Sequence, residues 1–365
     1  MLSNDDLVPV VSGTGPVASV YLDITSATTD PQGQADLRWK NFRRALEQDG
    51  TDTTTLAAMD AIVAEGHGGG DGLAMFATGG RVLHHSRWPD PPDQGLARWA
   101  PLASVGQLLH WRQSMVSYLV VRVDRAGADM VALLPGGPDI EAEVSGDDLH
   151  IQRSAPGGWS QRRFQQRAEN QWESNAGEVA DSLVKLFDEV SARLVVVSGD
   201  VRAIQFLKEG LPARVLDVVE EVDGGREEEA EDRIAEEALR LGAAAAAADT
   251  VALLAKFREE RGQDDRASDG VSPTVGALQR AQVETLLVRD DPTDERSLWF
   301  GPEGVHLAMA PEPLSELGVK AIQEGRLVDV LIRAALSTGS EIRILPTTAA
   351  NGPTDNVGAI LRWTD

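Results

Sequence analysis

Near the middle of the chain, apolar and polar residues alternate in three short segments, which predicts strands over residues 118–124, 129–134 and 140–144. Beyond them, apolar residues recur at helical spacing, which predicts one long amphipathic helix. The members of this stripe are Phe164, Ala168, Trp172, Ala176, Val179, Leu183, Phe187 and Val190. A β-branched run at residues 194–197 then predicts a buried strand, and residues 201–208 predict the helix after it. Three antiparallel strands, a long helix, a strand and a helix together predict an α/β layer of ribonuclease-H-like order.

The segments on either side of this layer also mix helices and strands. Toward the N-terminus a strand and two helices precede a hairpin closed at Gly79-Gly80, and the predicted elements are residues 17–23, 34–48, 53–65, 73–78 and 82–88. Toward the C-terminus helices and strands alternate over residues 274–280, 283–288, 328–336, 341–345 and 357–363. We therefore predict an α/β protein of three domains. They are a small N-terminal α/β domain (1–115), a middle domain (116–225) and a C-terminal α/β sandwich (226–365).

The composition is that of a soluble globular protein without a thiol-based scaffold. The chain has 365 residues, enough for two or three hydrophobic cores, and it has no cysteine. Disulfide scaffolds and thiolate metal sites are therefore excluded. The residues after Met1 lack the basic and apolar regions of a signal peptide, and the alanine run 243–248 meets Asp249 before it reaches the length of a membrane span. We expect a cytoplasmic protein with no membrane partner.

The usual motifs for cofactors and metals are missing from the sequence. There is no Gly-x-x-x-x-Gly-Lys phosphate-binding loop, and the turn 197–200 has one glycine and one aspartate, a poor phosphate cradle. His84 and His85 stand next to each other in a predicted strand, so they point to opposite faces and cannot share a metal. We expect no metal and no cofactor.

One basic stretch stands out against the acidity of the chain, whose formal net charge is −24. Such a surface repels phosphate, so we expect no DNA binding and only local contact with RNA. Between His150 and Ala168 there is no acidic residue, and a double glycine, Gly157-Gly158, lies inside the stretch. Its arginines are Arg153, Arg162, Arg163 and Arg167. Guanidinium groups grip phosphate bidentately, but the arginines can also form a solvated helix face behind an ordinary loop capped by Ser160.

An acidic run lies between Asp217 and Glu237, with eleven acidic residues and two arginines. We interpret it mainly as a solvated linker that continues into the exposed face of a helix extending past Leu239. The alternative is an acidic docking surface for a partner.

The last two thirds of the chain, roughly residues 116–365, resemble a family of translation factors in three places, in the same order. Gly157-Gly158-Trp159-Ser160, with Arg163-Phe164 and Arg167 beyond, is similar to the Gly-Gly-Gln-Ser loop and arginine-bearing helix of archaeal and eukaryotic class-1 release factors and Pelota. Residues 269–288 resemble the helix-to-strand segment of the family's last domain, and residues 358–363 its closing strand. More narrowly, the chain resembles the bacterial relatives that include the ribosome-hibernation factor Balon and its actinobacterial counterparts. The resemblance implies release-factor-like middle and C-terminal domains.

The chain departs from the family pattern at the residue on which peptide release depends. The family has a glutamine after the two glycines, and this chain has Trp159. An indole obstructs the water that the glutamine backbone helps to orient, so we expect no catalytic residue and no enzyme. Gln161 lies two residues later, and positioning errors near 1 Å already cost about 10²-fold in rate. Trp159 itself either folds against its own domain or stacks on a nucleotide as a plug.

The resemblance implies a non-enzymatic hibernation or stress factor in the A site of the 70S ribosome. The loop 157–160 reaches toward the peptidyl-transferase centre and blocks translation sterically, while Arg153, Gln161, Arg162, Arg163 and Arg167 contact ribosomal RNA. Elongation factor Tu is a candidate partner on the same ground. The alternative is a peptidyl-tRNA hydrolase that rescues stalled ribosomes, with Gln161 as its positioning residue. A third interpretation is a stress-regulated protein that has the same fold but binds another RNA or protein. No stop-codon-reading motif occurs in residues 1–113, so the contact of the N-terminal domain is open.

Overall fold

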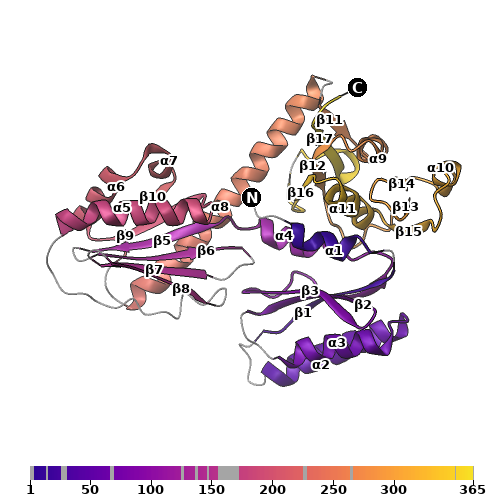
Figure 1. Cartoon of the computed structure of the whole chain (residues 1–365), viewed down its shortest axis with the longest axis horizontal. Helices are drawn as coiled ribbons and strands as arrows, with labels where there is room; N and C mark the ends of the chain where they lie inside the picture. The colour runs from indigo at the N-terminus through magenta and orange to yellow at the C-terminus, as the bar shows by residue number, and fades with distance from the viewer. Residues whose placement is uncertain are drawn as a thin grey trace. The chain divides into compact units, whose positions relative to one another are not determined.

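The computed structural model describes residues 4–13, 15–25, 31–65, 70–124, 127–135, 139–145, 148–154, 172–224, 228–263, 266–349 and 351–364. The chain divides into two compact units (Figure 1). The middle unit comprises Ser114–Ala248, and the outer unit combines Leu2–Gln113 with Asp249–Asp365. Both units combine helices with β-sheets, which confirms the predicted α/β class. The predicted domain boundaries near residues 115 and 225 stay predictions.

A six-stranded sheet in the order β10-β9-β5-β6-β7-β8 forms the centre of the middle unit. Its strands are β5 (Tyr118–Val123), β6 (Ala128–Leu133), β7 (Asp139–Ser145), β8 (Asp148–Ser154), β9 (Leu194–Gly199) and β10 (Val219–Glu221). Neighbours among β5 to β8 pair antiparallel, whereas β9 and β10 run parallel to β5. The order β7-β6-β5-β9-β10 is the ribonuclease-H-like order predicted from the sequence. Strand β8 adds an edge that the apolar pattern does not predict.

The central strands of this sheet are buried on both faces. On one side lie α5 (Trp172–Glu189), α6 (Val201–Gly210) and α7 (Ala213–Leu216), and on the other lies the first half of α8 (Glu228–Gly262). Successive residues of a strand point to opposite faces. In β5, Leu119 and Val121 therefore pack with α5 and α6, whereas Tyr118 and Val120 pack with α8. Strands covered on both sides read as continuous apolar runs, as residues 194–197 do.

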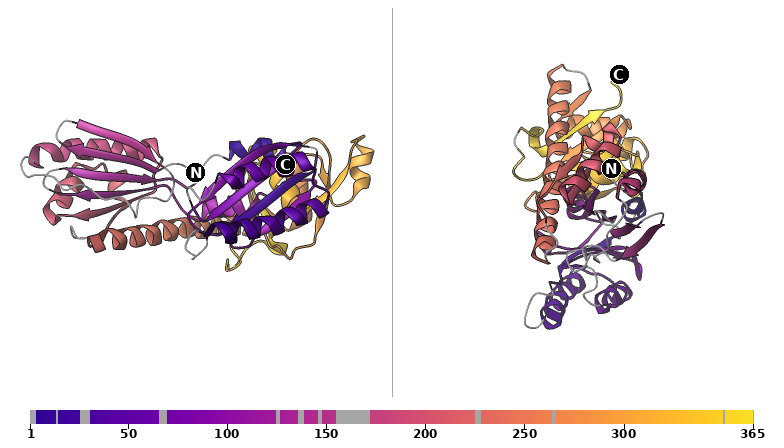
Figure 2. Two further views of the ribbon diagram at one scale, coloured as in Figure 1. Left: turned by 90° about the horizontal axis from the view of Figure 1, so that it is seen from below. Right: turned by 90° about the vertical axis from the view of Figure 1, so that its left-hand side faces the viewer.

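Helix α8 is the longest helix among the described residues, and it continues past Leu239 as predicted (Figure 2). Ile234 packs on the middle sheet, whereas Leu254 and Phe257 pack on the C-terminal sheet of the outer unit. By length and composition alone, Asp232–Gly262 is long and apolar enough to cross a membrane, although 22% of its apolar window is buried inside the protein. One such helix is weak evidence for a membrane protein.

The N-terminal segment of the outer unit is an antiparallel sheet in the order β3-β2-β1-β4. Its elements are η1 (Asp5–Leu7), α1 (Val8–Val11), β1 (Val17–Asp23), α2 (Pro31–Gln48), α3 (Thr53–Ala64), β2 (Gly72–Thr78), β3 (Arg81–Trp88), β4 (Leu96–Ala100) and α4 (Gly106–Gln113). Helices α2 and α3 cover one face of the sheet (Figure 1). Gly79 and Gly80 have φ angles of 55° and 74°, which the predicted two-residue hairpin turn requires.

The C-terminal segment contains a four-stranded sheet in the order β11-β17-β12-β16 and a small sheet in the order β14-β13-β15. Its elements are β11 (Ala267–Asp269), α9 (Val271–Gln279), β12 (Val283–Val288), β13 (Ser297–Phe300), β14 (Leu307–Ala308), α10 (Pro311–Glu316), β15 (Gln323–Arg326), α11 (Leu327–Ser337), β16 (Glu341–Ile344), η3 (Thr354–Asn356) and β17 (Val357–Leu361). All five predicted elements of this segment are present. The small sheet between β12 and α11 is not predicted by the sequence pattern.

A buried polar network joins the N-terminal and C-terminal segments inside the outer unit. The Tyr21 hydroxyl donates to the carbonyl of Ser104 at 2.8 Å, and the Ser104 hydroxyl donates to the Asp329 carboxylate at 2.9 Å. Arg326 lies 2.6 Å from Asp290 and 3.7 Å from Asp329. One guanidinium thus faces two carboxylates, and burial raises the pKa of Asp329 to about 7, against the pull of Arg326. The two segments therefore fold as one unit although the middle unit separates them in sequence.

Candidate functional site

The predicted site residues fall, with one exception, between β8 and α5. Gly157, Gly158, Trp159, Ser160, Gln161, Arg162, Arg163 and Arg167 lie outside the described residues. The exception is Arg153, which lies in β8 opposite Ile140 of β7. The roles expected for all nine residues stay predictions. The structure describes the two elements that flank these residues in sequence, a strand before them and a helix after them.

Strand β8 and helix α5 flank the segment 155–171. Strand β8 comes last in the sheet order and pairs with β7 from Ser145↔Asp148 to Asp139↔Ser154. After the segment, α5 begins at Trp172 and packs against the sheet through Val179 and Leu183. Residues 155–171 therefore follow an edge strand of a hydrogen-bonded sheet in sequence and precede a helix fixed to the core. Binding loops are commonly held by a rigid scaffold of this kind.

The apolar stripe predicted for the helix is confirmed where the structure describes its side chains. Val179, Leu183 and Val190 are buried, and Phe187 is partly buried. The guanidinium of Arg214, in α7, lies 5.8 Å from the centroid of the Phe187 ring. The same Arg214 pairs with the carboxylate of Asp188, with nitrogen–oxygen distances of 2.7 and 2.8 Å. The apolar face of α5 is therefore fixed to the sheet, and α7 holds the end of the helix.

The turn between β9 and α6 is a connection, as the sequence predicts. The Asp200 carboxylate accepts hydrogen bonds from the backbone N–H groups of Arg202 and Ala203, at 3.0 and 3.2 Å. Gly199 has a φ of 133°, and a Cβ atom there would lie 1.9 Å from the carbonyl oxygen of Val123. A helix N-terminus can bind phosphate, but here the cap already supplies the negative charge. This end of α6 therefore holds no phosphate site.

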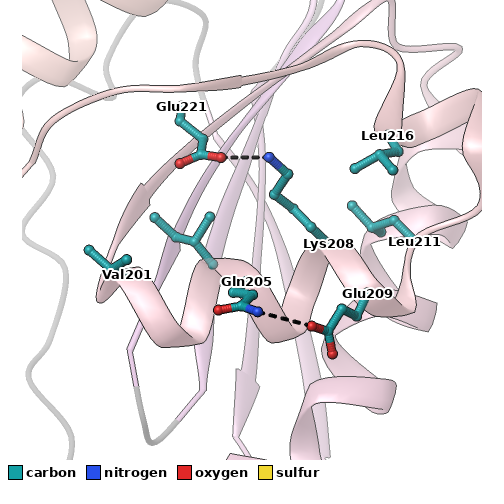
Figure 3. Close-up of a pocket in the computed structure, with 8 residues that line it drawn as sticks. Val201, Gln205, Lys208, Glu209, Leu211, Leu216 and Glu221 are labelled. Atoms are coloured by element: carbon teal, nitrogen blue, oxygen red, sulfur yellow. Dashed lines mark hydrogen bonds and ion pairs between the residues drawn. The ribbon is translucent and has the colours of Figure 1, made fainter.

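A groove on the outer side of α6 was not expected from the sequence. Its lining residues come from α6, α7, β10 and the connection between the two helices: Val201, Ile204, Gln205, Lys208, Glu209, Leu211, Leu216 and Glu221 (Figure 3). The Lys208 ammonium lies 2.6 Å from the Glu221 carboxylate. The one signal in the sequence is that α6 carries apolar residues on two faces, since Ile204 packs inward while Val201 points outward.

The stretch that contains this sheet, the segment 155–171 and α8 matches a known protein family. Residues 117–263 match the model of the bacterial archaeo-eukaryotic release factor family 2. This middle stretch is therefore similar to the bacterial relatives of the archaeo-eukaryotic release factors. This confirms the resemblance inferred from the double glycine and the arginines after it.

An uncharacterized mycobacterial protein is similar to this chain over nearly its whole length. Rv2629 of Mycobacterium tuberculosis (strain ATCC 25618 / H37Rv) is 29% identical, and the alignment covers 97% of this chain and 95% of that protein. MT2704 of strain CDC 1551 / Oshkosh matches to the same extent. The N-terminal segment, which lies outside the family match, is therefore shared with these relatives.

Solved structures of Pelota and of an archaeal termination factor superpose on the chain only loosely. Archaeoglobus fulgidus Pelota is 13% identical, with 99% of this chain and 91% of that chain covered and a TM-score of 0.36. Archaeal Pelota in a model of its ribosome-bound state with ABCE1 is 13% identical, with 98% and 92% covered and a TM-score of 0.42. The archaeal translation termination factor aRF1 is 16% identical, with 98% and 95% covered and a TM-score of 0.24.

The two adjacent histidines of β3, His84 and His85, differ in their surroundings. His84 Nδ1 lies 3.5 Å from the carboxylate of Asp6, which also pairs with Arg112 at 2.7 Å. Burial lowers the pKa of His84, so the imidazole is neutral at pH 7. His85 is exposed, so the two imidazoles face apart as predicted. In the described part of the chain, no group of three or more histidine, aspartate or glutamate side chains could hold a metal ion.

Proposed function

We propose that the protein is a ribosome-associated translation factor that acts by binding rather than by catalysis. It occupies the A site of the 70S ribosome during hibernation or stress, and its loop 157–160 reaches toward the peptidyl-transferase centre. The observation that carries the proposal is the family-matched stretch in which Gly157-Gly158 is followed by Trp159 instead of glutamine. The block is steric, because the loop excludes tRNA and shields the catalytic RNA.

The distribution of charge supports contact with ribosomal RNA through this segment. No acidic residue occurs between His150 and Ala168, whereas the whole chain carries a net charge of −24. The Debye length at physiological salt is about 8 Å, so a basic segment acts independently of distant carboxylates. The residues that we assign to ribosomal RNA are Arg153, Gln161, Arg162, Arg163 and Arg167. Four of them are arginines, whose planar guanidinium groups bind phosphate bidentately.

Trp159 decides between blocking and catalysis. Stacking of a base on an aromatic side chain is worth about 1–3 kcal/mol, so an indole at the tip of the loop adds affinity for RNA. The same indole fills the space in which a release factor orients its attacking water. The loop therefore still extends toward the peptidyl-transferase centre but does not promote peptide release.

Sedimentation with 70S ribosomes at graded salt tests the proposal. The protein should pellet with ribosomes at low salt and dissociate as salt rises, because each phosphate contact releases counterions. Replacing both Arg162 and Arg163 with alanine should reduce the slope of log affinity against log salt by about two. Arg202→Ala removes an exposed arginine of α6 and serves as the matched control, with no change in slope. Absence of pelleting even at low salt would contradict the proposal.

The second candidate function is hydrolysis of peptidyl-tRNA on stalled ribosomes, and Gln161 is the residue that favours it. Its amide lies two positions beyond the glutamine of the family pattern. Incubation with ribosomes that carry labelled peptidyl-tRNA separates the two functions. Release that is abolished by Gln161→Ala supports the hydrolase, and intact ribosome binding without release supports the blocker.

We extend the proposal to one protein partner and one location. Elongation factor Tu is the partner, on the ground of the family alone, and the cytoplasm is the location. Purified elongation factor Tu in its GTP state should raise the amount of protein that pellets with ribosomes. An unchanged amount at saturating elongation factor Tu would remove this part of the proposal.

A further inference from the structure

Exposed apolar side chains are concentrated on one part of the middle unit. Among the described residues, nine large hydrophobic side chains are exposed, and three of them lie within residues 201–216. They are Val201 (80% exposed), Phe206 (37%) and Leu216 (37%). The inner face of α6 is satisfied separately, because Ile204 and Leu207 pack on the sheet. These three exposed side chains are therefore not needed to complete the hydrophobic core of the unit.

Two of them, Val201 and Leu216, line the groove along α6. The groove has a volume of about 550 Å³, and its lining also includes the largely buried Ile204 and Leu211 (Figure 3). Helix α6 has ten residues and is therefore roughly 15 Å long. An apolar floor of this length accommodates two to three turns of a helix laid along it.

The rim of the groove is acidic. Of the eight described residues that line it, Lys208 is the one cation, and its ammonium is paired with Glu221 at 2.6 Å. The Glu209 carboxylate accepts only a neutral hydrogen bond there, from the side-chain amide of Gln205 at 3.2 Å. The stretch of this chain that follows α7 adds further negative charge. Its exposed carboxylates are Asp217, Glu220 and Asp223. Carboxylates thus outnumber cations among the lining residues and in the chain that follows α7, around an apolar floor.

We infer that this groove is a docking site for a basic amphipathic segment of a partner protein. Apolar side chains of such a segment fill the floor between Val201 and Leu216, and its lysines or arginines lie against Glu209 and the acidic rim. This helix-in-groove mode is a common form of peptide recognition. RNA is repelled by the rim, and a second copy of this chain brings its own net charge of −24. The site is independent of the loop 157–160 and of ribosome binding.

A peptide-binding measurement on the full-length protein tests this inference without ribosomes. The probe is a leucine–lysine peptide of about 15 residues, long enough to form a helix, with leucines at i, i+4 spacing. The double variant Val201→Ser, Leu216→Ser should weaken binding about tenfold. The matched control is Leu239→Ser, Val251→Ser, which removes equally apolar side chains, exposed by 53% and 64%, from α8. Equal affinity in both double variants would overturn the inference, because the peptide would then recognise acidity alone.

The absence of cysteine offers a second readout that locates the peptide. Gln205→Cys places a single thiol at the groove, and Val251→Cys places one on α8, each able to carry a photo-crosslinker. The peptide should form adducts from position 205 and not from position 251. Adducts of equal yield at both positions would overturn the inference, whether or not the protein binds ribosomes.

Discussion

The chain segments next to the two edge strands of the middle-unit sheet, β8 and β10, differ in charge. At the basic edge, β8 leads into a segment with no acidic residue between His150 and Ala168. At the acidic edge, β10 leads into the run between Asp217 and Glu237, which contains eleven acidic residues. Five strand spacings of about 4.8 Å separate the edges by roughly 24 Å, about three Debye lengths at physiological salt. Such a separation is what the two proposals, phosphate contact after β8 and docking of a basic protein segment near β10, require.

The strongest way to break this comparison is to reverse charge at the basic edge. Replacing Arg162, Arg163 and Arg167 with glutamate should lower ribosome affinity about 10³-fold at low salt, because three attractive phosphate contacts become repulsive. Co-sedimentation measures the effect.

The control restores the net charge of the protein but places the positive charges near β10 and not at residues 162–167. Adding Glu220→Lys, Glu221→Lys and Asp223→Lys to the same protein returns the formal net charge to −24, since three reversals of each sign cancel. Binding should stay lost. Recovery of ribosome binding would mean that overall charge matters and that the location of the arginines does not.

A core substitution in α5 tests the frame behind the basic edge. Leu183 is fully buried against the sheet, so Leu183→Ala should lower the free energy of unfolding of the middle unit by about 2–5 kcal/mol. Leu239→Ala, at a leucine that is 53% exposed, should change it by less than about 0.5 kcal/mol. Urea titration followed by circular dichroism compares the two. Similar losses would show that α5 does not anchor the segment as described.

Protonation of Asp329 should change the stability of the outer unit. The folded pKa of Asp329 is about 7, above the unfolded value of about 3.9. Its contribution to stability is therefore complete below about pH 4 and is lost as pH rises through about 7. Asp329→Asn should flatten the dependence of the unfolding midpoint on pH between about 4 and 7, the window between the unfolded and folded pKa values. Asp355→Asn, at an exposed site, should keep the wild-type profile, and matching profiles in both variants would refute the assignment.

The smallest expected effect concerns the ion pair at the acidic edge. Lys208→Met keeps the apolar stem of the side chain but frees the Glu221 carboxylate, so the leucine–lysine peptide should bind two- to threefold more tightly, roughly the worth of an exposed ion pair. Arg214→Met breaks a comparable pair with Asp188 outside the groove and should leave the affinity unchanged. Weaker binding by Lys208→Met would show that the ammonium itself is needed.

The periodicity of apolar residues was sufficient to predict the bounds of elements that bury one face or both faces. Strand β1 (Val17–Asp23) and strand β12 (Val283–Val288) have the bounds that the pattern predicts, because nearly every residue in them is buried. Strands β4 and β8 were missed, since each lies at the edge of its sheet, and no residue of β4 is fully buried. The pattern reports burial, and edge strands are held mainly by backbone hydrogen bonds.

Features that depend on distant parts of the chain could not be predicted from local pattern. The Ser104–Asp329 hydrogen bond joins residues 225 positions apart. The groove arises only when α6, α7 and β10 are placed side by side, although Val201 and Leu216 look like ordinary apolar residues in the sequence. The candidate loop 157–160 was inferred from its motif alone; the family match spans these positions, and the role of the loop stays a prediction.

A cryo-electron microscopy map of the protein on its 70S ribosome tests the central claim most directly. The account predicts density for the protein in the A site, with the loop 157–160 at the peptidyl-transferase centre and the side chains of Arg162, Arg163 and Arg167 against ribosomal RNA. Density outside the A site, or a loop turned away from the peptidyl-transferase centre, would contradict it.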